Sequence, residues 1–382
     1  MVDLAAVIRP GDGILWGQGC AEPQTLVEAV VAQRAALSGA SVFLGVSYSG
    51  IVKPEHADHL RLSSYCGTGT NRALADAGVL DINPAPYSQL GALLRERKIR
   101  CDVVLLQVSA PNRRGEYSLG LAVEYLAPAL KAARAIVAEV NEGVPWTHTE
   151  PLLHRKDFAL LVESSRPPVY LSYRAGSLES SIAGNAAAFV PERAVLECGI
   201  GNIPNAVLGA LGERRGLRYH SGVIPDGVAE LHAKGALSGE IHGGALMGTQ
   251  ALFDWARENP QVRLRSSDYT HAPAVLSKLE RFVAINSAVE VDYSGQVNGE
   301  VAKGSYVGAV GGALDFIRAA NQSPGGVALI CLPSNRIVER LSGPVATPRS
   351  EAGVIVTEKG SADLRGCTLR EREGRLRALC ET

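Results

Sequence analysis

The chain has 382 residues, of which 46% are apolar and 20% charged, and its formal net charge is −1 at pH 7. This length is too great for one ordinary core and suits two domains, and the composition is that of a globular protein. The near-zero charge gives no reason to expect nucleic acid or an anionic membrane surface as a partner.

The cysteines and histidines argue against a metal site. The seven cysteines are scattered without Cys-x-x-Cys spacing, and the eight histidines show no metal-binding spacing. Reduced thiols in a cytosolic protein are the plain interpretation. The first residues lack a basic segment followed by an apolar run, and no apolar stretch is long enough to cross a bilayer. We therefore expect a cytoplasmic protein with no metal and no membrane contact.

Short apolar runs alternate with helical patterns along most of the chain, which is typical of α/β architecture. In the first half, residues 103–106 indicate a buried strand, 126–134 a helix and 135–140 the next strand. In the second half, a strand over 194–198 precedes glycines and a helix that begins at Asn205. Further strands are predicted at 282–285, 327–332 and 353–357, and a final helix with one basic face at 368–379.

A domain boundary is expected near the middle of the chain. Two prolines at 167–168 end one element, and residues 174–177 are loop-like. We place the domains at 1–176 and 177–382. The segments 17–23 and 199–204 share a Gly-x-Gly followed by proline and a helix, which indicates related domains or a coincidence between glycine-rich turns.

Two glycine loops each open a helix in the second half. They are Gly199-Ile200-Gly201 and the run at 308–312. Glycines let the backbone approach a ligand closely, and a helix N-terminus offers free N–H groups to negative charge. A single Gly-x-Gly fits a plain turn about as well as an anion site, whereas two such loops favour an oxyanion or cofactor cradle.

The run at 285–298 alternates like a strand but carries Asn286, Glu290 and Asp292. We interpret it as an antiparallel hairpin with these polar residues on its wet face and a turn at 294–295. Ser221 beside His220 suggests a nucleophile–base pair, but adjacent residues on a strand point to opposite faces, so we exclude that pair.

Several motifs, spread over nearly the whole chain, form one ordered set. They lie at 17–27, 111–120, 139–145, 199–204, 286–298, 311–316, 356–358 and 362–366. In this order they resemble the acetyl-CoA hydrolase/transferase family, which includes 4-hydroxybutyrate, butyryl and succinyl CoA-transferases.

The resemblance implies two open α/β CoA-transferase-like domains facing each other across the active site, in a homodimer. It also implies that coenzyme A is bound as an acyl-CoA substrate and that a small carboxylate is the second substrate. In such enzymes a glutamate attacks the acyl-CoA and then carries CoA as an enzyme thioester to the second carboxylate.

Motif positions assign roles to residues of both halves. Backbone N–H groups would hold the thioester oxygen as it becomes negative. His271 falls where the family often has an asparagine that contacts CoA. The predicted oxyanion and CoA-binding residues are Gly201, Asn202, Ile203, His271, Gly311, Gly312 and Arg336, and the predicted acyl-pocket residues are Trp146 and Glu22.

The chain departs from the family pattern at the nucleophile. Where the family has a glutamate after His-Thr or His-Ser, this chain has Gly222, which has no side chain to attack with. A CoA-binding lysine is also missing, and Arg336 could supply that cation with a different geometry. Trp146 stands where the family usually has arginine, so the acyl side is bulkier and less cationic. The chain is also shorter than typical members.

Four hypotheses remain for the chemistry. Another carboxylate could replace the nucleophile, with Glu290 as the nearest candidate and Glu240 and Asp226 as outsiders. Since family members also have a glutamate at the Glu290 position, an orienting role fits that residue better. The space at Gly222 could instead admit water for thioester hydrolysis, with Glu290 as a possible base. The other two hypotheses are direct attack of a second substrate on the thioester, and CoA binding without catalysis. We expect a CoA-dependent acyl enzyme.

Overall fold

The computed structural model describes residues 2–381 and divides the chain into two compact units. The first unit runs to Leu171 and includes Gly244–Asp268 and Ser305–Val307. The second unit comprises Ser172–Gly243, Tyr269–Gly304 and the chain from Gly308. The chain thus returns twice to the first unit after the expected boundary at residue 176, and a single boundary does not describe it.

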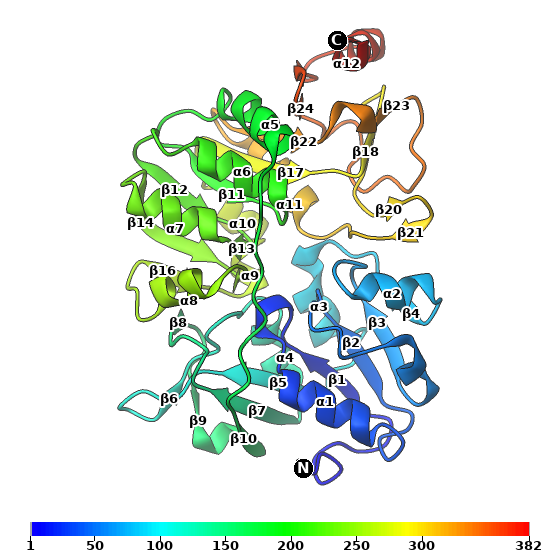
Figure 1. Cartoon of the computed structure of the whole chain (residues 1–382), viewed down its shortest axis with the longest axis vertical. Coiled ribbons are helices and arrows are strands. Elements are labelled where there is room, and N and C mark those ends of the chain that lie inside the picture. The colour runs from blue at the N-terminus through cyan, green and yellow to red at the C-terminus, as the bar shows by residue number, and fades with distance from the viewer. Residues whose placement is uncertain (1, 382) are drawn as a thin grey trace. The chain divides into compact units, whose positions relative to one another are not determined.

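The first unit is built on a seven-stranded parallel sheet in the order β10-β7-β5-β1-β2-β3-β4. All residues of β5 are buried, as their apolar run predicts. Helix α1 packs against β7 (Figure 1). The bounds are β1 (Gly13–Trp16), β2 (Ser41–Leu44), β3 (Arg61–Ser64), β4 (Leu80–Ile82), β5 (Val103–Val108), β7 (Ala135–Asn141), β10 (Leu160–Ser164), α1 (Gln24–Gln33), α2 (Asn71–Asp76), α3 (Leu90–Arg95) and α4 (Leu126–Ala132).

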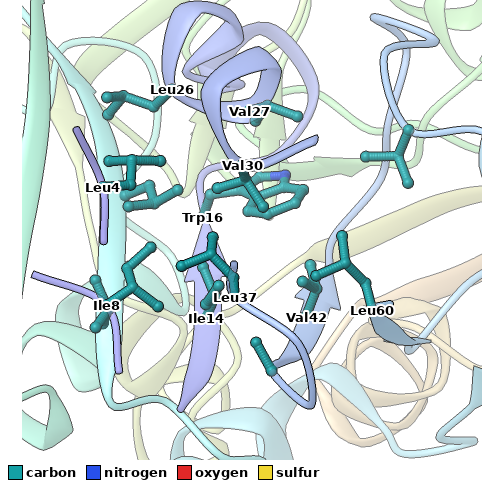
Figure 2. Close-up of a cluster of buried hydrophobic side chains, with 14 of the residues drawn as sticks. Leu4, Ile8, Ile14, Trp16, Leu26, Val27, Val30, Leu37, Val42 and Leu60 are labelled. Carbon is teal, nitrogen blue, oxygen red and sulfur yellow. The ribbon is translucent and has the colours of Figure 1, made fainter. Parts of the chain in front are cut away.

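An apolar cluster holds the first unit together (Figure 2). Trp16 of β1, Leu26 and Val30 of α1, and Val42 of β2 are all at most 2% exposed. The smaller elements of this unit are β6 (Glu116–Tyr117), β8 (His148–Thr149), β9 (Leu153–His154), β15 (Ala245–Leu246), β16 (Val262–Leu264), β21 (Ser305–Tyr306) and α8 (Gln250–Ala256).

In the second unit the strand order is β25-β24-β22-β17-β11-β12-β14. These pairs are parallel except the last hairpin, β24–β25. The bounds are β11 (Val195–Cys198), β12 (Leu217–His220), β14 (Leu237–Gly243), β17 (Phe282–Ser287), β22 (Val327–Cys331), β24 (Val354–Thr357), β25 (Gly360–Asp363), α5 (Ser177–Ala187), α6 (Asn202–Ala210), α7 (Asp226–Ala233), α10 (Pro273–Leu276), α11 (Ala313–Gln322) and α12 (Leu369–Glu381).

The strands predicted from apolar runs are all confirmed, with ends displaced by at most two residues. The first glycine-loop helix, α6, begins at Asn202 instead of Asn205. Its extra turn is possible because Pro204 lies in the first turn, where a missing N–H costs nothing. The helix predicted at 126–134 ends at Ala132. Helix α9 (Ser267–Thr270) contains the point where the chain leaves the first unit.

The predicted hairpin is confirmed, but its polar residues are not on a wet face. Strand β18 (Glu290–Asp292) pairs antiparallel with β19 (Val297–Asn298) and parallel with β23 (Ile337–Val338). Glu290 and Asp292 are only 9% and 6% exposed. Asp292 Oδ1 accepts hydrogen bonds from the N–H and hydroxyl of Ser294 and from the N–H of Gln296. Local hydrogen bonds therefore allow burial that alternation alone does not predict.

No helix within residues 2–381 is long and apolar enough to span a bilayer.

Candidate active site

The two predicted glycine loops and the His220–Gly222 segment belong to the second unit. Each of them is adjacent in the sequence to one of its strands or helices. The first loop follows β11, and Ser221 and Gly222 follow β12. The Ser221 hydroxyl donates to the Cys198 carbonyl and accepts from the Cys198 N–H, so the ends of β11 and β12 are joined. The carboxyl ends of parallel strands are where open α/β sheets place ligands.

The first glycine loop has a backbone that only glycine adopts readily. Gly201 has φ 131° and ψ 174° and caps α6 without a side-chain hydrogen bond to the first turn. The N-terminal N–H groups of α6 are therefore not satisfied by a capping side chain. Asn202 Oδ1 accepts a hydrogen bond from the Arg174 N–H, which holds its side chain against the preceding segment. This local arrangement fits the oxyanion role expected for Gly201, Asn202 and Ile203.

An imidazole lies close beside Gly222. A Cβ atom on Gly222 would lie 3.1 Å from Cε1 and 3.3 Å from Nε2 of His271. A Cβ atom on Gly312 would lie 2.5 Å from the same Nε2. The ring of Phe316, in the first turn of α11, is 4.5 Å from the imidazole, centroid to centroid. His271 therefore lies against both Gly222 and the second glycine loop, a contact that no sequence motif predicted.

Both histidines of this cluster are neutral near pH 7. Burial, with a smaller effect of His220, lowers the pKa of His271 to about 3. Burial also lowers the pKa of His220 to about 4. His220 donates from Nε2 to the Thr270 carbonyl, and His271 Nδ1 shares a hydrogen bond with the Thr270 hydroxyl. Ser221 bonds to Cys198 and not to His220, as strand geometry predicted.

Glu197 is a buried acid that the sequence analysis missed. It lies on β11 and accepts hydrogen bonds from the Ile285 N–H at 3.1 Å and from Asn286 Nδ2 at 2.8 Å. The other amide atom, Asn286 Oδ1, lies against Gly199, where a Cβ atom would meet it at 2.7 Å. Glu197 thus fixes the amide that supports the first loop. The sequence signal for Glu197 is a single acidic residue within an otherwise apolar predicted strand.

Replacing Glu197 with glutamine should change how stability depends on pH. Burial raises the pKa of Glu197 from 4.5 to about 8, so the folded protein holds a proton that the unfolded chain releases. This stabilisation is fully present below pH 4.5 and is lost as pH rises through 8, with a difference on the order of a few kcal/mol. In urea denaturation across that range, Glu197→Gln should lose less stability than wild type.

The matched control is Glu280→Gln, which changes an exposed glutamate. Its unfolding free energy should follow the wild-type pH curve. Parallel curves for wild type and Glu197→Gln would contradict the protonated state.

Glu290 is tied into the hairpin. Its two carboxylate oxygens accept from the Ser342 hydroxyl, and Oε2 also accepts from the Ser342 N–H and Asn298 Nδ2. Burial acts to raise its pKa, but these hydrogen bonds and the charge of Arg336 outweigh burial and lower it. The carboxylate is ionised with its lone pairs engaged, which favours an orienting role over that of a base. Arg336 is half-buried after β22.

The two predicted acyl-pocket residues lie in the first unit. The Glu22 carboxylate is buried and accepts from the hydroxyls of Ser47 and Ser49; burial raises its pKa, and these hydrogen bonds only partly offset the effect. Trp146 donates its indole N–H to the Glu116 carbonyl. Trp146 also lines a cavity of about 340 Å³, and Glu22 does not.

The cavity beside Trp146 is lined by two arginines, a histidine and a glutamate. Arg263, Arg265 and His148 line it together with Glu150, which pairs with Arg265 at 2.8 Å. Its volume falls in the range of small-ligand pockets. Trp146, Arg263 and Arg265 therefore line the same cavity. Among residues 2–381 no group of three or more His, Cys, Asp or Glu could hold a metal ion.

Comparisons with known proteins agree with this fold. Residues 2–162 match the acetyl-CoA hydrolase/transferase N-terminal domain, and residues 248–381 match the C-terminal domain. The chain is 35% identical over 379 residues to the 4-hydroxybutyrate coenzyme A transferase of Clostridium kluyveri, covering 94% of this chain and 88% of that protein.

Solved structures give the same result. RipA from Yersinia pestis superposes with a TM-score of 0.93 at 28% identity, and a 4-hydroxybutyrate CoA-transferase from Porphyromonas gingivalis with 0.83 at 29%. Each covers 99% of this chain and 92% of the other. Fold and sequence together define an α/β enzyme of the CoA-transferase class. The chain belongs to the acetyl-CoA hydrolase/transferase family.

Proposed function

We propose that the protein transfers CoA between small carboxylic acids by direct attack of the acceptor carboxylate on a bound acyl-CoA, without a glutamyl–CoA intermediate. One observation carries this proposal. Position 222, where the resemblance places the nucleophile, has no side chain, and the His271 imidazole fills the space beside it. The glycine loops are retained, which supports thioester binding.

The direct route balances without an enzyme nucleophile. A carboxylate oxygen of the acceptor attacks the thioester carbon, the C–S bond breaks, and CoA leaves as thiolate with a mixed anhydride beside it. The thiolate then attacks the acceptor's carbonyl carbon, which forms the new acyl-CoA and releases the original acid as carboxylate. N–H groups at Gly201–Ile203 and at Gly311–Gly312 would stabilise the oxygen that becomes negative in each step.

A thioester hydrolase is the second candidate. The His271 imidazole beside Gly222 could hydrogen-bond an attacking water through Nε2, but its pKa of about 3 makes it a weak base. Hydroxide would then displace CoA thiolate, leaving the free acid. The other substitute, Glu290, is less suited because Ser342 and Asn298 occupy its oxygens.

Initial-rate kinetics test the proposal. Acetyl-, butyryl- and succinyl-CoA would be incubated with and without acetate while free CoA and new acyl-CoA are followed. We expect new acyl-CoA only with acceptor present, and double-reciprocal plots that intersect. Parallel plots would indicate an enzyme intermediate and contradict direct attack. Release of CoA without acceptor would identify a hydrolase, and saturable CoA binding without turnover would leave a binding protein.

The acceptor and the acyl group are proposed only as a class, small carboxylic acids. We also propose that the enzyme works in the cytoplasm as a homodimer, with Arg336 contributing positive charge to CoA binding and Trp146 and Glu22 contributing to the acyl pocket. The family resemblance supports these assignments.

A further inference from the structure

We propose that the His271 ring leaves no room for a long side chain at position 222. Two residues, Gly222 and His271, and not Gly222 alone, then prevent a glutamyl–CoA intermediate at this position. This inference rests on the proposed function. It concerns residues that are remote in sequence but adjacent in the second unit.

The backbone at Gly222 does not require glycine. Gly222 is not among the residues with positive φ, in contrast to Gly201 and Gly311. A Cβ atom there would meet only the His271 ring closely, at 3.1 and 3.3 Å, with Phe316 Cε2 at 3.8 Å. Glycine at 222 is therefore explained by lack of room beside the imidazole and not by backbone conformation.

The imidazole cannot move away easily. The Phe316 ring packs against it with the centroids 4.5 Å apart and the planes tilted by 47°, and the Thr270 hydroxyl is 2.9 Å from Nδ1. Gly312 is also close to the ring, since a Cβ atom there would be 2.5 Å from Nε2. The Cβ positions of both glycines thus lie against the imidazole, and atoms added at 222 would require the ring to shift in a place where Gly312 leaves it little room. Overpacking of this kind is destabilising in a closely packed interior.

Electrostatics add to the exclusion. His271 is 3% exposed and its burial favours the neutral ring. Position 222 is half-buried, and the neutral ring beside it offers a glutamate there no cation to hold its carboxylate ionised. Exchanging only Gly222 would therefore give a crowded acid with no cationic partner in this ring.

The test compares wild type, Gly222→Glu, His271→Asn and the double variant. Asparagine is smaller than histidine, and its amide can still bond to Thr270. With acyl-CoA and borohydride, we expect the double variant to yield at least about tenfold more trapped alcohol at position 222 than Gly222→Glu, a factor equivalent to about 1.4 kcal/mol. It should also show parallel double-reciprocal plots, and a higher Tm than Gly222→Glu.

Each other outcome decides against the inference. Equal trapping and equal Tm in Gly222→Glu and the double variant would show that His271 excludes nothing. A folded double variant that yields no trapped glutamate would show that these two residues are not what closes the covalent route.

Two further measurements cover misfolding and failure of the proposed function. If the double variant does not fold, Gly222→Ala is compared with and without His271→Ala. Gly222→Ala should lower Tm in the histidine background and leave it unchanged in the alanine background, and equal shifts would overturn the inference. Trapping of a thioester in wild type would contradict the proposed function alone, because the Tm comparison still reports on the contact.

Discussion

Gly201→Val is expected to lose about a hundredfold or more in thioester turnover and about 1–3 kcal/mol in stability. The combination of φ 131° and ψ 174° is almost restricted to glycine, and a β-branched residue would rotate the peptide that begins α6. Steric contact is not the cause, since a Cβ atom would be 3.8 Å from Pro204 and 4.0 Å from Ser287. The loss in turnover follows if the loop N–H groups hold the oxyanion.

Gly209→Ala is the matched control for Gly201→Val. Gly209 lies near the other end of α6, has no positive φ, and has open space around its Cβ position. Alanine there should raise helix stability by about 0.5–1 kcal/mol and leave turnover unchanged. Acyl-CoA turnover and urea denaturation measure both effects. A folded Gly201→Val protein with wild-type turnover would remove this loop from the mechanism.

Gly312→Ala is expected to destabilise the protein by about 1–3 kcal/mol through steric contact alone. Gly312 has φ −88°, which alanine adopts freely, but its Cβ atom would lie 2.5 Å from His271 Nε2 and 2.9 Å from Cδ2. The ring would have to turn against Phe316, and the second glycine loop would shift with it. Thermal and urea denaturation measure the loss, and the rate of acyl-CoA turnover should fall with it.

The control for Gly312→Ala is Gly184→Ala in α5, where nothing lies within 4 Å of the Cβ position. That variant should be slightly more stable than wild type. Equal stability of Gly312→Ala and Gly184→Ala would show that the imidazole shifts at no cost, and would contradict tight packing of His271 against Gly312.

The features that the sequence predicts well are those set by local chemistry. Apolar runs such as 103–106 and 327–332 become buried strands because they carry apolar side chains on both faces, and both faces must then be covered. The loops at Gly201 and Gly311 have the positive φ angles that their glycines allow. The family motifs predict the acetyl-CoA hydrolase/transferase family, which the matches over 2–162 and 248–381 confirm.

The features that the sequence does not predict depend on contacts between distant segments. Nothing near His271 indicates that its ring fills the space beside Gly222, and the alternation around Glu290 and Asp292 favours an exposed face. In the folded unit β18 has neighbours on both edges, so those carboxylates are buried with hydrogen-bond partners. Likewise, no change of composition marks the return of residues 244–268 to the first unit.

Intact-mass analysis of the wild-type protein tests the central claim, that thioester chemistry proceeds here without an enzyme-bound glutamyl–CoA. The protein would be incubated with acyl-CoA under conditions of measured turnover and treated with borohydride, which reduces a glutamyl thioester to an alcohol. If the acceptor attacks directly, the protein mass should stay unchanged while new acyl-CoA accumulates. Conversion of one glutamate to its alcohol, located by peptide mapping at Glu290 or any other position, would contradict direct attack.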